Sequence, residues 1–131
     1  MSELLRVLVV DDEEPLLSFL KTALERGGLR VTAATSGKEA LKMLERGEFS
    51  GVVSDLRMPD GIGGAELYDW VREHRPELSS RFLFITGNAS DPYAMEVQER
   101  THTQFIEKPF RIALLIELIK KISSPREDAH A

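Results

Sequence analysis

Three aspartates, a threonine and a lysine stand directly after apolar runs of the chain. Asp11 and Asp12 follow one run, Asp55 follows another, and Thr86 and Lys108 follow two later ones. If the runs are parallel strands, their carboxyl ends meet at one edge of a sheet, and the three carboxylates come together there. Repulsion between these charges must be relieved by protonation or by a cation, and carboxylate oxygens favour Mg²⁺. The sequence therefore predicts weak binding of a divalent cation.

An ionised carboxylate beside Mg²⁺ can be a nucleophile without a separate base. Asp55 could attack a phosphoryl group and form an aspartyl phosphate, while Mg²⁺, Thr86 and Lys108 neutralise the oxygens of the transferred group. Taken singly, each residue also fits a structural role: Asp11 and Asp12 as charges at a helix N-terminus, the others as turn or surface residues. Their joint placement at one edge favours the phosphoryl chemistry.

Five apolar runs have the length of strands and are bounded by polar or glycine-containing stretches. The first, third and fourth look apolar on both faces, which is typical of central parallel strands covered by helices above and below. Helical spacing of apolar residues follows each run, so we expect a doubly wound α/β sheet with right-handed crossovers. The predicted strands are Arg6–Val10, Arg30–Ala34, Gly51–Ser54, Arg81–Ile85 and Gln104–Ile106.

The five predicted helices contain residues that mark their ends. A capping box of Ser36 with Glu39 opens the second helix, and Asp91 caps the fourth, which is the least hydrophobic. The third helix stops before Pro76, because proline cannot continue a helix. Glycines end the first two helices, and the fifth, which has the strongest apolar stripe, ends near Ser123.

Length and composition are those of one globular domain. The chain has 131 residues, 42% of them hydrophobic and 30% charged, and we assign residues 1–125 to the domain and 126–131 to a polar tail. It has no cysteine, and its 17 basic residues are scattered among 22 acidic ones, which argues against direct nucleic acid binding. The apolar start runs into Asp11 without a cleavage site, so we expect no membrane anchor and a cytoplasmic location.

Four segments of the chain resemble the receiver domain of two-component response regulators. They are Val9–Glu13, Ser54–Pro59, Phe84–Gly87 and Glu107–Phe110, and the likeness extends from Arg6 to about residue 123. The resemblance implies a flavodoxin-like, five-stranded parallel sheet in the order 2-1-3-4-5, flanked by five helices. It also implies a signalling phosphoacceptor rather than an enzyme, with self-catalysed phosphotransfer and autodephosphorylation only.

The resemblance assigns roles to the acidic residues. Asp55 would accept a phosphoryl group from a phosphohistidine of a histidine kinase or a histidine phosphotransfer domain. Asp12 and Asp55 would ligate Mg²⁺ directly together with the backbone carbonyl of Arg57, and Asp11 would act mainly through a bound water. Arg57 and Asn88 also match positions that tune dephosphorylation in receivers.

The resemblance also implies a conformational switch. Thr86 and Lys108 would contact the phosphoryl oxygens, and Phe105 would turn into the space that Thr86 leaves. The Lys108–Pro109 bond is typically cis in receivers. The changed surface would comprise the fourth helix, fifth strand and fifth helix, where a homodimer could also form. Because Phe105 lacks the hydroxyl of the tyrosine common there, we expect a low bias between the two states.

One loop departs from the family pattern. The stretch from Met58 to Leu67 has about one extra residue, with Gly63 where an aspartate is usual, so we expect a mobile loop.

The sequence details resemble most the receivers of hybrid histidine kinases, so the chain is either such a receiver or a free-standing one. The alternatives are an aspartate-nucleophile phosphatase and an interaction module that is never phosphorylated.

Overall fold

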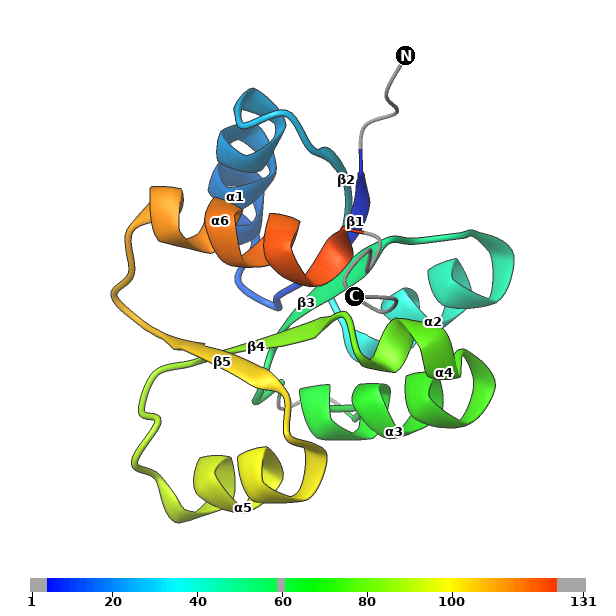
Figure 1. Cartoon of the computed structure of the whole chain (residues 1–131), viewed down its shortest axis with the longest axis vertical. Coiled ribbons are helices and arrows are strands. Elements are labelled where there is room, and N and C mark those ends of the chain that lie inside the picture. The colour runs from blue at the N-terminus through cyan, green and yellow to red at the C-terminus, as the bar shows by residue number, and fades with distance from the viewer. Residues whose placement is uncertain (1–4, 59–60, 125–131) are drawn as a thin grey trace, which may run out of the picture.

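The computed structural model describes residues 5–58 and 61–124, which form three layers with a sheet between helices (Figure 1). Within these ranges five parallel strands pair in the order β2-β1-β3-β4-β5. The doubly wound sheet and its strand order are therefore as predicted. The strands are β1 (Arg6–Val10), β2 (Arg30–Ala34), β3 (Gly51–Asp55), β4 (Phe82–Thr86) and β5 (Gln104–Glu107).

Helices cover both faces of the sheet. Two of them, α1 and α6, pack on one face, and α2, α3 and α5 pack on the other (Figure 1). None of the helices in the described part of the chain is long and apolar enough to cross a membrane. The helices are α1 (Glu14–Arg26), α2 (Gly37–Arg46), α3 (Gly64–His74), α4 (Pro76–Ser79), α5 (Pro92–Thr101) and α6 (Ile112–Ser123).

The predicted number of five helices is wrong, because the described residues contain a sixth. Pro76 ends α3 as expected, but it also occupies the first turn of the short helix α4, where a missing N–H costs nothing. Leu78 is buried and anchors α4 to the core. The fourth and fifth helices of the sequence prediction are therefore α5 and α6. Pro59 and the predicted tail, 126–131, lie outside the described residues.

The predicted helix caps are largely present. The Ser36 hydroxyl accepts a hydrogen bond from the Glu39 amide at 3.0 Å, and the Asp91 carboxylate accepts from the first-turn amides of α5. The Glu39 carboxylate, however, accepts from the amide of Thr35 at 2.7 Å, one residue before the cap. The start of α2 is thus fixed by a shifted form of the capping box.

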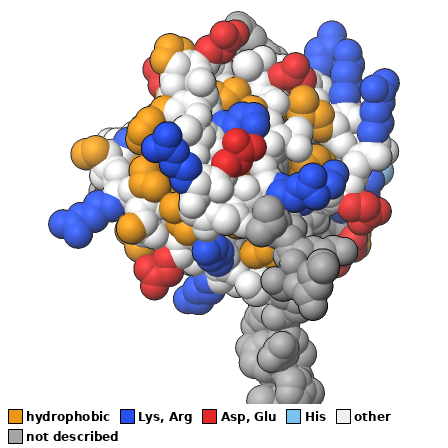
Figure 2. Space-filling model, turned by 90° about the horizontal axis from the view of Figure 1, so that it is seen from above, with side chains coloured by type: hydrophobic (Ala, Val, Ile, Leu, Met, Phe, Trp, Pro, Cys, Tyr) orange, Lys and Arg blue, Asp and Glu red, His pale blue; other side chains and the backbone are white. Residues whose placement is uncertain are grey.

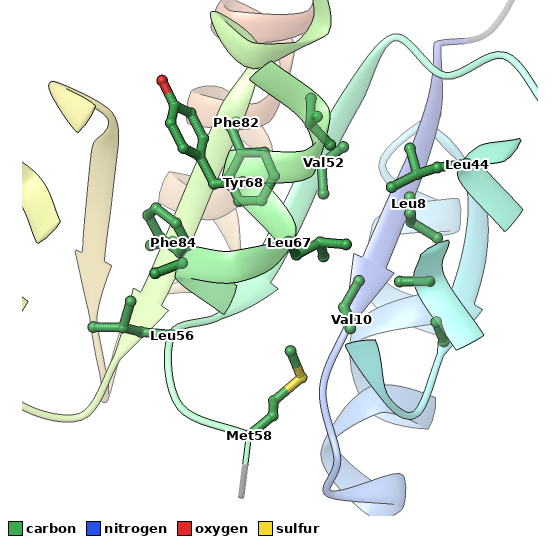
Figure 3. Packing of buried hydrophobic residues seen from close by; sticks show 14 of the residues in the cluster. Leu8, Val10, Leu44, Val52, Leu56, Met58, Leu67, Tyr68, Phe82 and Phe84 are labelled. Atoms are coloured by element: carbon green, nitrogen blue, oxygen red, sulfur yellow. The ribbon is translucent and has the colours of Figure 1, made fainter. Parts of the chain in front are cut away.

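Alternate residues of the central strands enter two separate apolar cores. Val7 and Val9 of β1 face α1 and α6, whereas Leu8 and Val10 face the opposite layer. Figure 3 shows the second core, in which the chain beyond β3 also takes part through the buried side chains of Leu56 and Met58. The chain directly after β3 is therefore anchored by Leu56 and Met58, whereas residues 59–60 of the loop that was predicted to be mobile lie outside the described residues.

Three strands, β3, β4 and β5, each extend one residue beyond their predicted ends. The ladder continues through the pairs Asp55 with Ile85 and Thr86 with Glu107. Asp55, Thr86 and Glu107 are thus the last residues of their strands rather than the first residues of loops. Their positions are fixed by the hydrogen bonding of the sheet itself.

Gly64 allows the first turn of α3 to approach the end of β3 closely. Its amide donates to the Leu56 carbonyl at 3.0 Å, and a Cβ at Gly64 would lie 2.4 Å from the carbonyl oxygen of Asp55. A side chain here meets rigid backbone rather than a flexible group. Gly64 therefore helps to set the height of α3 above the sheet edge.

We expect Gly64→Ala to destabilise the domain by about 2 kcal/mol, because the added methyl group overlaps backbone. The midpoint of thermal unfolding, followed by circular dichroism, should fall by roughly 8 °C for a domain of this size. Gly87→Ala is the control, since a Cβ at Gly87 would meet nothing within 4 Å. Equal midpoints for the two variants would contradict this account of α3.

Candidate functional site

The carboxyl ends of β1 and β3 bring three carboxylates together. Asp11 and Asp12 follow β1, and Asp55 ends β3, which is the direct neighbour of β1. One carboxylate oxygen from each of the three residues lies within 4.8 Å of the others. The sheet edge therefore gathers the acidic cluster that the sequence predicts.

Asp11 is fully buried and keeps one oxygen without a protein partner. Its Oδ1 accepts from the Glu13 amide at 2.9 Å, whereas its Oδ2 has no hydrogen-bond partner among the described residues. Burial raises the pKa of the Asp11 carboxyl, and the Glu13 amide opposes this rise. A buried oxygen of this kind needs a donor or a cation, so the acidic cluster fits Mg²⁺.

Asp55 is half-buried and its charge is unfavourable in the folded protein. Burial is the main cause that raises its pKa to about 6, and the nearby charge of Asp11 adds to the effect. The ammonium group of Lys108 acts in the opposite direction. Above this pKa the fold holds an ionised Asp55 at a cost that a cation would relieve.

Thr86 and Lys108 lie at the ends of the next two strands. The Lys108 amide donates to the Thr86 carbonyl at 2.8 Å, and the Lys108–Pro109 peptide bond is cis. The Lys108 ammonium lies 3.9 Å from a carboxylate oxygen of Glu13, close to the acidic cluster. The Thr86 side chain is almost buried, and its hydroxyl accepts from the Asn88 amide at 3.2 Å. The five residues singled out in the sequence thus share one edge.

Phe105 lies behind Thr86 in the neighbouring strand. It pairs with Phe84 in the ladder between β4 and β5, and the two ring centroids are 5.1 Å apart. The ring is half-buried and packs against the core of α2, α3 and α5. It therefore lies at the border between this core and solvent.

A pocket of about 200 Å³ opens beside Asp55 and Thr86. Arg57 and Asp91 line the same pocket and form an ion pair with each other, which the sequence analysis did not find. Asp91 was expected only as a helix cap. Arg57 was considered for its backbone carbonyl and as a position that tunes dephosphorylation. The two residues are 34 positions apart, and nothing in the local sequence pairs them.

The other end of the sheet has a larger hollow than the pocket beside Asp55. This hollow has a volume of about 730 Å³ and lies between Arg6, Arg30 and Arg46. These side chains are exposed and come from the amino ends of β1 and β2 and from the end of α2. Figure 2 shows basic side chains spread among acidic and apolar ones on the face it displays. The chemistry of the acidic cluster, rather than volume, identifies the candidate site.

The raised pKa of Asp55 predicts a pH-dependent gain of stability in Asp55→Asn. The folded state binds the Asp55 proton more tightly than the unfolded chain, so this group lowers stability as pH rises from about 4 through about 6. Without divalent cations, the thermal midpoint of Asp55→Asn should exceed that of the natural chain by roughly 10 °C at neutral pH, and this gap should close below about pH 4. Asp69→Asn, at an exposed carboxylate, is the control. A gap that does not vary with pH would contradict the prediction.

Known protein families and relatives match most of the chain. The family model of the response regulator receiver domain matches residues 7–120. The chain is 34% identical to the sensor kinase CckA of Brucella abortus over 88% of its own length, but it spans only 12% of that protein. It is 31% identical to the response regulator receiver protein CpdR of the same organism, covering 89% of this chain and 95% of that one.

Solved structures agree with the sequence comparison. A response regulator receiver protein of Sinorhizobium medicae superposes with a TM-score of 0.82 at 30% identity, over 95% of this chain and 98% of the other. The response regulator TrrA of Thermotoga maritima, solved in complex with Mg²⁺ and BeF, gives 0.79 at 30% identity, over 91% of this chain and 99% of the other. Since the family model covers nearly the whole domain and the sheet edge carries the expected carboxylates, the chain belongs to the response regulator receiver domain family of two-component signalling.

Proposed function

We propose that Asp55 accepts a phosphoryl group from a phosphohistidine of a histidine kinase or a histidine phosphotransfer domain. The observation that carries this proposal is the cluster of three carboxylates within 4.8 Å, which contains a buried Asp11 oxygen without a protein partner. Asp11, Asp12, Asp55 and the backbone carbonyl of Arg57 would hold Mg²⁺. The bound ion supplies positive charge that shields the carboxylates from each other and from the incoming phosphoryl group.

The transfer itself needs no general base from the protein. A carboxylate oxygen of Asp55 forms a bond to phosphorus while the bond from phosphorus to the donor imidazole nitrogen breaks. The electron pair of that bond stays with the imidazole. The Lys108 ammonium and the Thr86 hydroxyl then donate hydrogen bonds to the phosphoryl oxygens.

Binding of Thr86 to the phosphoryl group would link the site to Phe105. The Thr86 hydroxyl would leave the Asn88 amide, from which it now accepts, and move towards Asp55. The Phe105 ring, half-buried beside Phe84, would turn into the space that this leaves. The surface that changes comprises α5, β5 and α6, which is also the surface where a homodimer could form.

The place of the chain in a signalling system follows from its relatives in part. It spans a small part of a sensor kinase but nearly all of CpdR, so both a hybrid-kinase receiver and a free-standing receiver have relatives at this level of identity. In either setting the domain would act in the cytoplasm as a phosphoacceptor whose only chemistry is its own phosphorylation and dephosphorylation. It would not contact nucleic acid directly.

Incubation with acetyl phosphate and Mg²⁺ should add the mass of one phosphoryl group to the protein. Asp55→Asn should remain unmodified, and removal of Mg²⁺ should abolish the adduct in the natural chain. Intact-mass spectrometry measures both, with Asp69→Asn as a control that should be modified normally. An unmodified natural chain would favour the interaction module, and sustained turnover of a phosphate monoester would favour the phosphatase.

Phosphorylation should move the ring of Phe105. We expect its side-chain NMR resonances to shift when Mg²⁺ and beryllofluoride, a phosphoryl mimic, are added, because the ring enters the space beside Thr86. In Thr86→Ala the hydroxyl that follows the phosphoryl group is gone, so the shift on adding the mimic should shrink. Resonances of Phe105 that stay in place while Asp55 binds the mimic would refute this coupling.

A further inference from the structure

Arg57 is tied by its side chain to the start of α5. Its guanidinium forms an ion pair with the carboxylate of Asp91 and lies over the ring of Tyr93, with Cζ 4.7 Å from the ring centroid. The Arg57 side chain is 60% exposed, whereas that of Asp91 is 31% exposed. The arginine therefore reaches from the loop after β3 across to a helix that begins 34 residues later.

Asp91 uses one oxygen for two tasks. Its Oδ2 accepts from the Arg57 guanidinium and also from the amides of Tyr93 and Ala94, at 3.1 and 3.2 Å. The same atom thus caps α5 and holds the arginine. The Arg57 guanidinium pulls the pKa of the Asp91 carboxyl below its usual range, so this carboxylate is charged at neutral pH.

The chain around Asp55 directs Arg57 towards the pocket. Leu56 and Met58 are buried in the core, as Figure 3 shows, whereas the Arg57 side chain between them is 60% exposed. Asp55 and Arg57 consequently line one pocket, together with Thr86 and Asp91. The guanidinium lies beside the phosphoacceptor without being paired to it.

We infer that the Arg57–Asp91 ion pair is a latch on the phosphoacceptor pocket, and that Asp91 is a positioning residue that holds the guanidinium away from the phosphoryl group until the latch opens. This inference rests on the proposed function, because it requires a phosphoryl group on Asp55. We use "latch" below for these two side chains only.

The charges of the phosphoryl group and of Asp91 determine which of the two Arg57 favours. A phosphoryl group brings about two negative charges and three strong acceptor oxygens, whereas Asp91 offers one charge already shared with two amides. A guanidinium matches phosphate geometry through two parallel hydrogen bonds. Arg57 can therefore leave Asp91 for the phosphoryl group, at the cost of the ion pair and of its contact with Tyr93.

Opening the latch would reach α5 directly. Arg57 is a link between the loop after β3 and the first turn of this helix, and its departure leaves Asp91 as a cap alone. The first turn of α5 is then free to shift relative to the sheet edge. The strength of the Arg57–Asp91 ion pair would therefore determine how much free energy the phosphoryl group must supply to release the arginine.

Substitution Asp91→Asn tests the latch with little change to the helix cap, because asparagine and aspartate cap helices about equally well. The affinity for beryllofluoride in the presence of Mg²⁺ should rise by about fivefold, which corresponds to roughly 1 kcal/mol for a partly exposed ion pair. In an Arg57→Gln background the same substitution should change the affinity by about twofold at most. Glu25→Gln, which breaks the exposed Lys21–Glu25 pair on α1, away from α5 and the pocket, should leave the affinity unchanged.

In a second measurement the variant itself is observed without metal or mimic. In Arg57→Gln the latch is already open, so the NMR amide resonances of Tyr93 and Ala94 should be displaced towards their positions in the beryllofluoride-bound natural chain. Glu25→Gln, which breaks an exposed ion pair on α1, should leave these resonances in place. This readout separates the latch from a contribution of Asp91 that is only structural.

The outcomes separate the latch from the proposed function. A natural chain that binds no beryllofluoride with Mg²⁺ refutes the proposed function and the latch together. A natural chain that binds it, combined with an equal gain from Asp91→Asn in both backgrounds, refutes the latch alone. Unmoved Tyr93 and Ala94 amides in Arg57→Gln would refute the release of α5.

Discussion

Mutual repulsion of three carboxylates at one sheet edge is the constraint on which the rest of the site depends. The parallel pairing of β1 with β3 forces Asp11, Asp12 and Asp55 together, and burial makes the charge of Asp11 and Asp55 still less favourable. Such a cluster is stable only with protons or a cation. The same repulsion would favour a bound divalent ion, whose charge would in turn favour an incoming phosphoryl group. Lys108, directly after β5, contributes a positive charge that partly opposes the rise in the pKa of the Asp11 and Asp55 carboxyls.

Most of this arrangement could be predicted from the sequence because a parallel sheet collects the ends of its strands. Runs that are apolar on both faces identify central strands, and the polar residues that follow them must share an edge. The errors at this level were small: β3, β4 and β5 extend further than their apolar runs, because Asp55, Thr86 and Glu107 still pair in the ladder. Polar residues show where the buried side chains of a strand end, whereas the backbone hydrogen bonds of the sheet can continue beyond that point.

Other features depend on contacts between distant segments and could not be predicted in this way. Pro76 was correctly expected to end α3, but whether a new helix starts there depends on Leu78 finding a buried place in the core. The role of Asp91 as a helix cap follows from its neighbours in sequence. Its ion pair with Arg57 instead requires the loop after β3 to lie beside the start of α5, which only the assembled sheet determines. Local patterns therefore predicted elements and site residues better than the contacts between them.

The small buried surface of α5 makes this helix easy to influence through its ion pair with Arg57. Only Ala94 and Val97 of this helix are buried, whereas α3 buries five residues. A helix with so little buried apolar surface costs less to displace than its neighbours. Thr86 would act on β5 through Phe105, and Arg57 would act on the first turn of α5 through Asp91. A group bound at Asp55 that engages both Thr86 and Arg57 would therefore change two neighbouring elements in the chain, α5 and β5, at the same time.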